Sequence, residues 1–313
     1  MAQMTWTFDA PTGTYKNNAM SSKLRTRAVE ESVFADHVRP VEGYGKKMGE
    51  NVTLTRVGRL TEPSSAALTE GERIPEDSFS LSVTTITPAE LGRAVPYTSL
   101  SEDFSKFDLE NPIQRILREQ LTLVLDTLAA AAFQGAQVKY APTGLASYTI
   151  ATAGTFGATA TANLNTYHLE EIRDYLFDTL FCPMIGGSYV GIFRTLGLRG
   201  VKRDPAWEEW HKYTDPGAKF NNEIGRWENI RLIETNHSNA LAKVGTGSVL
   251  GEGVVFGADA VAQAEVMTPE LRAAVPTDFG RSKAIAWYGI LGYDEPYGTS
   301  NSGEARIIHV GSA

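Results

Sequence analysis

The sequence is poor in the residues and motifs from which catalytic and metal sites are built. Its 313 residues include one cysteine, Cys182, so an internal disulfide is impossible. The flanking Phe181 and Pro183 indicate a buried, unreactive thiol, which fits a reducing compartment. The five histidines stand apart from one another, and neither a His-Glu-x-x-His motif nor paired cysteines occur. We therefore expect no metal site.

Motifs for nucleotide binding and for acyl transfer are also missing. The chain has no Gly-x-Ser-x-Gly elbow and no phosphate loop ending in Gly-Lys-Ser or Gly-Lys-Thr. The glycines of 251–257 are spaced one residue too far apart for the dinucleotide fingerprint and are better explained as turns. The sequence thus predicts no cofactor and no catalytic residue, which favours a protein that is not an enzyme.

Long hydrophobic runs are absent. The most apolar stretch, 121–133, is interrupted by Thr122, Asp126 and Thr127. A membrane-spanning helix needs about 20 mostly apolar residues. The N-terminus has neither the basic nor the apolar segment of a signal peptide. We therefore expect no membrane span and no signal peptide.

Positive charge is not concentrated in any part of the chain. The formal net charge is −8, the sequence pI is about 5.3, and no block of five like charges occurs. Contacts from lysine and arginine to phosphate dominate nucleic-acid affinity, so tight and direct DNA binding is not expected. The aromatic segment Trp207–Tyr213 also carries Glu208 and Glu209, which favours a packing or interface patch over a base-stacking surface.

The sequence does contain the alternating pattern of a long antiparallel hairpin. The apolar positions are Val52, Leu54 and Val57 on one arm, and Phe79, Leu81 and Val83 on the other. Residues 60–77 between the arms are polar and contain Pro63, Gly71 and Pro75, so we expect an irregular tip. A two-stranded ribbon is only marginally stable by itself. The alternation leaves open whether the apolar face packs on its own domain or on a neighbouring subunit.

A long amphipathic helix follows the hairpin. Asn111 is a candidate N-cap, Pro112 suits the first helical position, and Gly135 ends the pattern. Apolar residues recur at three- and four-residue spacing, namely Ile113, Ile116, Leu117, Leu121, Val124, Leu125 and Leu128. At 1.5 Å per residue the predicted helix over 111–135 is roughly 35 Å long. Asp126 lies within the apolar stretch, and we expect its side chain to face solvent or a partner.

The remainder of the chain divides into an arm and a region of mixed elements. The first fifty residues are polar with balanced charge, which is typical of an extended arm, and a short helix is predicted over 23–34. The small and polar residues of 141–163 mark a boundary. A second helix is predicted from Leu169, Ile172, Leu176 and Leu180. Strands are predicted over 188–193, 229–234, 254–256, 284–290 and 305–310. We expect the last three to pair beside the long helix.

Two stretches of the sequence, and the order of its parts, carry a family resemblance. LTEGERIPEDSFSLSVTTITPAELGRAVPYTSLSEDFSKFDLENPIQRILREQL (68–121) joins the hairpin to the long helix, and NNEIGRWENIRLIETNHS (221–238) contains a predicted strand. They resemble passages of tailed-bacteriophage major capsid proteins with the HK97-type fold, in the family typified by certain short-tailed phages. The likeness in architecture extends over nearly the whole chain. These motifs are structural, so they imply a fold and no chemistry.

The resemblance implies an α+β fold with the parts of an HK97-type subunit. These are an N-terminal arm (1–50), an extended β-hairpin loop that lies over a neighbouring subunit (51–96), and a peripheral domain (97–162) with the spine helix (111–135). They continue with an axial domain near the five- and six-fold axes (163–242) and return strands of the peripheral domain (243–313).

The function that the resemblance implies is self-assembly. Such proteins form pentamers and hexamers of an icosahedral shell around double-stranded DNA, which they enclose without sequence-specific binding. The expected partners are other copies of the chain, with scaffold, portal and decoration or cement proteins. The expected location is the virion capsid, assembled in the host bacterial cytoplasm. The negative net charge suits a wall that encloses DNA without binding it tightly.

The sequence departs from some relatives in two ways. Some of them weld the shell through a bond between a loop lysine and an asparagine of another subunit, but no lysine occurs here between Met48 and Ser105. That form of cross-link is therefore not expected. Some relatives also carry a long N-terminal scaffolding region, whereas about fifty residues precede this hairpin, which favours a separate scaffold or an already short arm.

Charged residues of the hairpin are the predicted contacts between subunits. They are Arg56, Arg59, Glu62, Glu70, Glu72 and Arg73. Charge complementarity of this kind sets register and partner choice more than affinity. Two alternatives stay open. One is a shell of the same fold that encloses a cargo enzyme. The other is an enzyme within 163–242 that uses His168, Asp174 or Glu209, which nothing in the sequence brings together.

Overall fold

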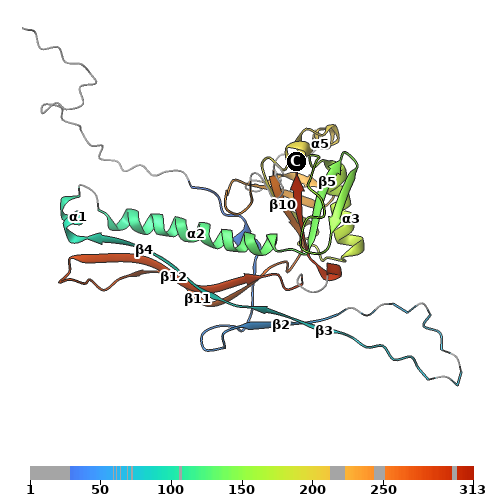
Figure 1. Cartoon of the computed structure of the whole chain (residues 1–313), viewed down its shortest axis with the longest axis horizontal. Coiled ribbons are helices and arrows are strands. Elements are labelled where there is room, and N and C mark those ends of the chain that lie inside the picture. The colour runs from blue at the N-terminus through green and yellow to red at the C-terminus, as the bar shows by residue number, and fades with distance from the viewer. Residues whose placement is uncertain are drawn as a thin grey trace, which may run out of the picture.

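A computed structural model describes residues 29–313, apart from several short segments. The segments left out are 59, 61, 64, 69, 72, 106–107, 212–222, 243–250 and 298–301. Figure 1 shows a long helix lying along a narrow sheet, a compact body at one end of both, and a hairpin that extends past that body. No helix in the described part of the chain is long and apolar enough to cross a membrane.

The narrow sheet has four strands in the order β1-β11-β12-β4. Their bounds are Arg39–Pro40 (β1), Ala262–Ala273 (β11), Ser282–Asp294 (β12) and Ala89–Thr98 (β4). β1 pairs with β11 in parallel, and the other neighbours are antiparallel. At about 3.3 Å per residue the two longest strands span roughly 40 Å, so the sheet is about as long as the helix that lies on it. The strand predicted over 284–290 is confirmed and extends further at both ends.

The long helix α2 runs over Glu110–Gln134, which confirms the predicted range to within one residue at each end. It packs on the four-stranded sheet through a cluster that contains Leu117, Ile285 and Trp287. The Trp287 indole donates a hydrogen bond to Gln120 Oε1 at 3.2 Å. The apolar stripe predicted from residue spacing therefore covers the sheet, and the one polar atom of the buried indole has a partner on the same helix.

The start of α2 differs from the prediction. Asn111 lies inside the first turn and is not the cap. Asp108 instead accepts hydrogen bonds from Glu110 N (3.1 Å) and from Asn111 Nδ2 (2.5 Å). Its carboxylate supplies the negative charge that a helix N-terminus favours. At the other end Gly135 closes the helix, and its N–H donates to Ala131 O at 3.0 Å.

The compact body is built on a seven-stranded mixed sheet with the order β6-β5-β13-β10-β7-β9-β8. The strands are Ser147–Ala151 (β6), Val138–Gly144 (β5), Ile307–Ser312 (β13), Gly251–Phe256 (β10), Tyr189–Arg194 (β7), Ile230–Thr235 (β9) and Glu223–Trp227 (β8). Helix α3 (Thr166–Asp174) continues into a π-helical turn over Tyr175–Thr179 and packs against the sheet. The predicted second helix is confirmed, as are the strands predicted over 188–193 and 229–234.

Two strands that were expected beside the long helix lie in the seven-stranded sheet, and they contact that helix at its C-terminal end, so the prediction is confirmed for them only in part. β10 and β13 pair with each other, and every residue of both is buried. Val254 and Phe256 pack with Phe133 at the end of α2, whereas Val255 packs in the cluster that contains α3 residues such as Leu169. A strand covered on both faces is typically a nearly continuous apolar run. The runs GEGVVF and ARIIHV fit that position and would be poorly matched to a half-exposed sheet.

The predicted hairpin is present as the pair β2 (Val52–Val57) and β3 (Leu81–Ile86). Val52 lies opposite Ile86, and Val57 lies opposite Leu81. The described residues between 58 and 80 belong to no helix or strand, which confirms the irregular tip. Phe79, which was expected in the second arm, lies just outside it. The chain then runs from β3 directly into β4 of the four-stranded sheet.

Short elements complete the fold. They are the 3₁₀ helices Phe34–His37 (η1) and Ser302–Glu304 (η5), and the helices α1 (Ser99–Phe104), α4 (Arg199–Lys202) and α5 (Pro205–His211). Of the helix predicted over 23–34, residues 23–28 lie outside the described residues, and 29–33 are not helical. Trp207 of α5 is buried and lies with its ring centroid 6.1 Å from that of Trp227. The packing role predicted for the aromatic segment is confirmed for this residue.

Ionisable side chains are buried near one another where β5, β13 and the end of β12 come together. Lys139 Nζ donates to Gln134 O at 2.6 Å and lies 3.0 Å from His309 Nδ1. Glu295 is 3% exposed, and its Oε1 has no hydrogen-bond partner among the described residues. Burial, together with the neighbouring Asp294 carboxylate, raises the pKa of Glu295 to about 8. The Glu295 carboxyl is therefore mostly protonated at neutral pH.

The substitution Glu295→Gln is expected to change how stability depends on pH. An unfolded glutamate ionises near pH 4.5, whereas Glu295 in the folded protein ionises near pH 8. The wild-type protein therefore loses stability as the pH rises through this window, by up to about 1.4 kcal/mol per pH unit. Glutamine has the same shape and does not ionise. The variant should gain stability over the wild type steadily from about pH 4.5 to about pH 8. Urea unfolding of both proteins measures this difference, and a constant difference across the window would contradict the raised pKa.

Candidate inter-subunit surfaces

The β2–β3 hairpin packs on its own subunit by one face, which we call the inner face. Val52 and Ile86 of this face are buried in a cluster with Ala262 and Ala264 of β11. Arg56 on the same face is 8% exposed. The alternation left open whether the hairpin packs on its own domain or on a neighbouring subunit. The inner face packs within its own subunit.

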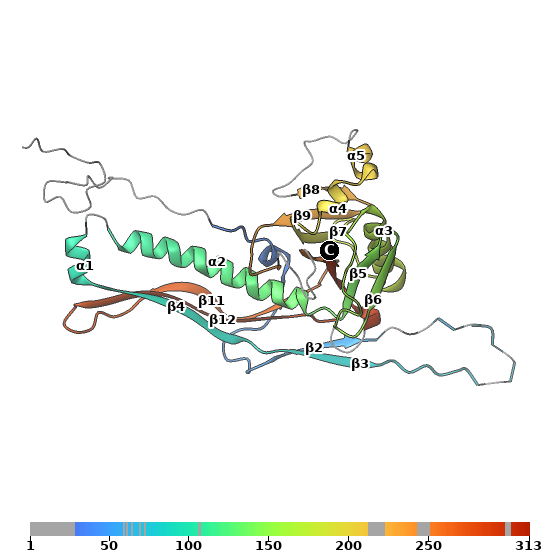
Figure 2. The ribbon, with the colours of Figure 1, turned by 45° about the horizontal axis from the view of Figure 1, so that its top comes forward.

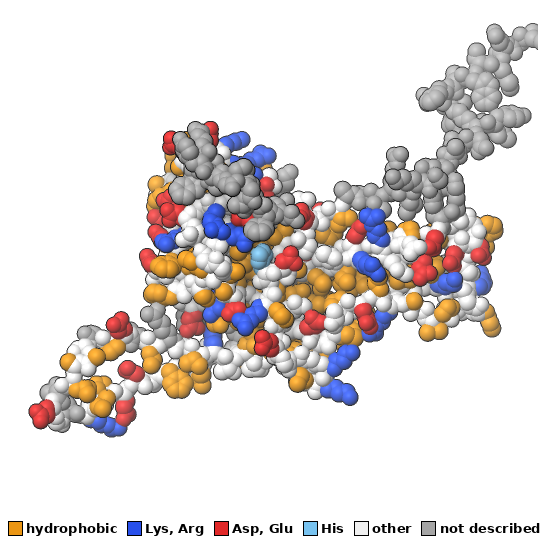
Figure 3. All heavy atoms as spheres, turned by 180° about the vertical axis from the view of Figure 1, so that it is seen from behind, with side chains coloured by type: hydrophobic (Ala, Val, Ile, Leu, Met, Phe, Trp, Pro, Cys, Tyr) orange, Lys and Arg blue, Asp and Glu red, His pale blue; other side chains and the backbone are white. Residues whose placement is uncertain are grey.

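The opposite face of the hairpin, the outer face, is apolar and exposed. Val57, Leu81 and Val83 lie on it and are 66%, 60% and 55% exposed. The register places Val57 directly opposite Leu81, and Val83 lies on the same face opposite Thr55, so the three apolar side chains form a cluster at the end of the ribbon nearest the tip. More apolar side chains are exposed along the tip, namely Leu60, Leu68, Ile74 and Phe79. Figure 2 shows the hairpin projecting beyond the body, and Figure 3 shows apolar side chains along it.

Arg56 was predicted to contact another subunit, but its guanidinium has partners inside its own subunit. Its Nε donates to Ser82 Oγ at 2.5 Å and lies 3.4 Å from Glu304 Oε2, and its Nη1 donates to Pro296 O at 3.1 Å. Thr84 Oγ1 donates to the same Pro296 oxygen at 3.1 Å. Arg56 is thus part of the attachment of the hairpin to the segment that follows β12.

The other predicted contact residues are spread along the tip. Glu62, Glu70 and Arg73 are exposed. Arg73 forms an ion pair with Glu76, three residues later. The two remaining predicted contacts, Arg59 and Glu72, lie outside the described residues. The structure therefore presents Glu62, Glu70 and Arg73 on one projecting segment and does not gather these three charges into a single site within the subunit.

A second exposed apolar surface lies at the far end of the four-stranded sheet, where sequence reasoning predicted nothing. Phe104 at the end of α1 is 84% exposed, and Phe279 in the turn between β11 and β12 is fully exposed. Asp278 and Phe279 both have positive φ, a conformation that non-glycine residues adopt at a cost. Ser99 N donates to Arg281 O at 3.0 Å, which joins α1 to the turn. The signal available in the sequence was a phenylalanine placed inside a polar turn, TDFGRS.

His168, Asp174 and Glu209, which were the candidate acid–base residues of an enzyme, do not form a site. His168 is buried, and its ring nitrogens lie 2.9 Å from Tyr140 Oη and 2.9 Å from Gly144 O. Burial lowers the pKa of His168. Asp174 accepts a hydrogen bond from Arg173, and Glu209 is exposed on α5. Each of the three thus has its own surroundings, and His168 serves the packing of α3 against β5.

The described residues do not favour a metal site, a reactive cysteine or a ligand-binding groove. No group of three or more histidine, cysteine, aspartate or glutamate side chains in the described ranges is placed to hold a metal ion. Cys182 is buried, and burial raises the pKa of its thiol to about 11, as expected for an unreactive cysteine. A groove of about 370 Å³ opens beside the hairpin root, but Arg39 and Asp259 in its wall bind each other at 2.5 Å.

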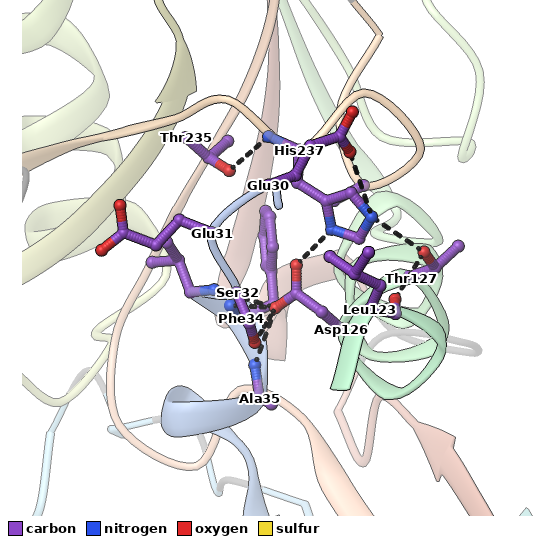
Figure 4. A network of polar contacts seen from close by, with 12 residues as sticks. Glu30, Glu31, Ser32, Phe34, Ala35, Leu123, Asp126, Thr127, Thr235 and His237 are labelled. Atoms are coloured by element: carbon purple, nitrogen blue, oxygen red, sulfur yellow. Dashed lines mark hydrogen bonds and ion pairs between the residues drawn. The ribbon is translucent and has the colours of Figure 1, made fainter. Parts of the chain in front are cut away.

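A buried polar network lies where the arm, α2 and the loop after β9 meet (Figure 4). Asp126 was expected to face solvent or a partner, and that prediction was wrong, because its side chain is fully buried. One carboxylate oxygen accepts from the Phe34 N–H at 2.7 Å, and the other accepts from His237 Nδ1 at 2.6 Å. Burial acts to raise the pKa of Asp126, but the hydrogen bonds from His237 and from the arm outweigh it and hold this pKa below its ordinary value.

Several solved structures have the same fold as this chain. The acid-stable capsid of Helicobacter pylori bacteriophage KHP30 matches with a TM-score of 0.71 and 13% identity over 95% of each chain. The capsid of cyanophage Pam1 matches with a TM-score of 0.70 and 15% identity, over 98% of this chain and 100% of that one. The capsid of cyanophage P-SCSP1u matches with a TM-score of 0.69 and 14% identity, over 96% and 95%. The expected α+β HK97-type fold is therefore confirmed.

The sequence itself carries a family signal that is independent of the fold. No curated protein sequence is significantly similar to this chain. The sequence profile of the phage capsid family, however, matches residues 16–180, which include the hairpin, β4 and the whole of α2. This match extends over more than half of the chain, and the chain therefore belongs to the phage capsid family.

Proposed function

We propose that this protein assembles as pentamers and hexamers into an icosahedral shell that encloses the double-stranded DNA genome of a tailed phage. Membership of the phage capsid family supports the shell role. The observation that carries the proposal is the projecting hairpin, whose outer face is apolar and exposed on both strands. Single exposed apolar side chains are common on soluble proteins, but a cluster of them on both strands of one ribbon is typical of an interaction surface.

The partner that we propose for the outer face is a neighbouring copy of the chain. β2 and β3 pair only with each other among the described strands, so each leaves one edge without a strand partner. Such edges and an apolar face together are a liability for a protein that stays monomeric. A neighbouring subunit lying under the hairpin would cover the apolar face. Glu62, Glu70 and Arg73 at the tip, with Arg59 and Glu72, would then set the register of the contact.

The far end of the four-stranded sheet is the second proposed contact surface. Phe104 and Phe279 are exposed there beside charges of both signs, because Lys283 Nζ binds Glu102 at 2.8 Å and Asp278 lies next to Phe279. A surface that carries an apolar centre and both charges is suited to contacts between identical chains. The hairpin and this end lie at opposite extremes of the subunit (Figure 2), so each copy could bind several neighbours at once.

The proposed domain division follows the order arm (1–50), extended loop (51–96), peripheral domain with the spine helix (97–162), axial domain (163–242) and return strands (243–313). Two features of the sheets favour adjusted boundaries. β4 begins at Ala89 and belongs to the four-stranded sheet, so the free part of the loop is shorter than 51–96. β10 and β13 belong to the seven-stranded sheet, so they are better assigned to the axial domain.

The remaining parts of the proposal concern partners and location. Scaffold, portal and decoration or cement proteins are the proposed partners besides other copies, and the host bacterial cytoplasm is the proposed place of assembly. The lack of lysine between Met48 and Ser105 favours a shell held by non-covalent contacts at the loop. The net charge of −8 supports enclosure of DNA without tight binding.

Deletion of residues 63–72 is expected to leave a folded subunit that no longer forms shells. The tip contains no helix or strand among its described residues, so its loss removes little of the fold. Circular dichroism and thermal unfolding measure the fold, while sedimentation and negative-stain microscopy measure assembly, with and without a scaffold protein from the same locus. Intact shells from the deletion would contradict the role of the loop. A wild-type chain that stays monomeric under every condition would overturn the shell proposal itself.

The outer and inner faces of β3 allow a matched test. The double substitution Leu81→Thr with Val83→Thr keeps strand propensity but removes apolar area from the outer face. It should leave the melting temperature unchanged and raise the protein concentration needed for assembly by about tenfold or more. Ile86→Thr on the buried inner face is the control, and it should destabilise the subunit by about 2 kcal/mol. Normal assembly of the double variant would exclude the outer face as a contact.

A further inference from the structure

The described part of the N-terminal arm is attached between two other parts of the chain. On one side Glu31 N donates to Asn236 Oδ1 at 2.8 Å, and Ser238 Oγ donates to Glu30 Oε1 at 2.9 Å. These bonds join the arm to the loop that follows β9 in the seven-stranded sheet. On the other side the arm lies against α2. Residues 29–37 thus form a strap across the junction of the helix and the body (Figure 4).

The strap places an aromatic side chain into the junction itself. Phe34 is fully buried, and its ring centroid lies 5.5 Å from that of Phe133 in the last turn of α2. Leu241, which follows the β9 loop, and Phe256 of β10 belong to the same core cluster. The arm therefore supplies part of the core that holds α2 to the seven-stranded sheet, and its departure would leave a cavity at this junction.

Asp126 binds the strap through one carboxylate oxygen. Asp126 Oδ1 accepts hydrogen bonds from Ser32 Oγ (3.0 Å), Val33 N (2.9 Å), Phe34 N (2.7 Å) and Ala35 N (3.3 Å). Three of these donors are backbone N–H groups at the start of η1, so the carboxylate of one helix serves as the N-terminal cap of another. The strap is held by a charge that belongs to α2.

Asp126 binds the body through the other carboxylate oxygen. His237 Nδ1 lies 2.6 Å from Asp126 Oδ2, and both side chains are buried. The second ring nitrogen of His237 faces Thr127 Oγ1 at 3.4 Å and Glu30 Oε2 of the strap at 3.8 Å. The His237 backbone N–H donates to Thr235 Oγ1 at 3.2 Å, which holds the loop at the end of β9.

We propose that Asp126 is a two-sided latch, which couples the seating of the N-terminal strap to the position of the loop at 236–238, so that the two are released together. A buried carboxylate is stable only while its hydrogen bonds are complete, and loss of one set of donors leaves the charge undercompensated. Withdrawal of His237 would therefore draw water toward Asp126 and weaken the bonds to the strap. Withdrawal of the strap would weaken the bond to His237 in the same way.

The consequence is a conformational device within the subunit. With the latch closed, α2 and the seven-stranded sheet share Phe34 and are held in one arrangement. With the latch open, the strap and the loop at 236–238 are both free, and the sheet can change its position relative to the helix. This inference goes beyond the shell proposal, because it concerns the isolated subunit.

Amide hydrogen exchange on the purified, unassembled full chain tests the coupling. The substitution His237→Ala touches none of the N–H groups of 33–35, whose acceptor is Asp126 Oδ1. If the latch is coupled, those amides should exchange about tenfold faster than in the wild type. His237→Asn, which can still donate to Asp126, should restore much of the protection. Arg115→Ala, at an exposed position of the same helix, is the matched control and should change neither segment. Faster exchange confined to 235–240 in His237→Ala would overturn the proposal.

A double-mutant cycle gives a second test. Ser32 and His237 contact opposite oxygens of Asp126. The single substitutions Ser32→Ala and His237→Ala, each of which removes one donor to Asp126, and their combination are compared by urea unfolding. If the latch is coupled, the double substitution should change the unfolding equilibrium constant by a factor that differs from the product of the two single factors by at least about threefold. Strictly independent effects would overturn the latch. Both tests use the unassembled chain, so failure of the shell proposal would be seen separately, as the absence of particles from the wild-type protein.

Discussion

The constraint on which the rest of this fold depends is that one helix packs on two sheets. Leu117 in the first third of α2 packs with Trp287 of the four-stranded sheet, and Phe133 near the end of α2 lies 4.6 Å, ring to ring, from Phe256 of the seven-stranded sheet. A helix of this length curves only gently, so it sets the distance between the two sheets. The strap, the hairpin root and the buried Lys139 group all lie near the place where the two sheets approach the end of α2.

This arrangement places the exposed apolar surfaces far from the junction. The core that stabilises the subunit is concentrated in the body and along α2, whereas α1 with Phe104, the β11–β12 turn with Phe279, and the tip of the hairpin lie at the extremes. Substitutions at the extremes can therefore change association without changing the fold, and substitutions at the junction should do the reverse. A subunit with this division can be tuned for assembly independently of its stability, which suits a protein of the capsid family.

Regular elements could be predicted from the sequence because their signal is local. The spacing of apolar residues placed α2 to within one residue, alternation placed β2 and β3, and short apolar runs placed β7 and β9. The partners of strands and of polar groups could not be predicted in this way. Asp126 occupies a position that is polar in an apolar stretch, and its burial depends on donors about 90 and 110 residues away in the sequence. The burial of β10 and β13 on both faces likewise depends on α2 and α3.

The junction contains a buried ionic network beside its apolar core, although apolar contacts alone would hold the same parts together without a buried charge. Buried ionic groups are weak evidence for stability, since an apolar replacement of similar volume is often as stable. Buried ionic groups do restrict the structure to one arrangement, because each donor must lie within hydrogen-bond distance of its acceptor. Asp126 accepts from two separate segments, so the arrangement in which strap, helix and loop meet is the one in which its charge is compensated. An apolar junction would tolerate many relative positions of the sheet and helix. The observed network tolerates one closed position, and any other position requires the strap and the loop to leave together.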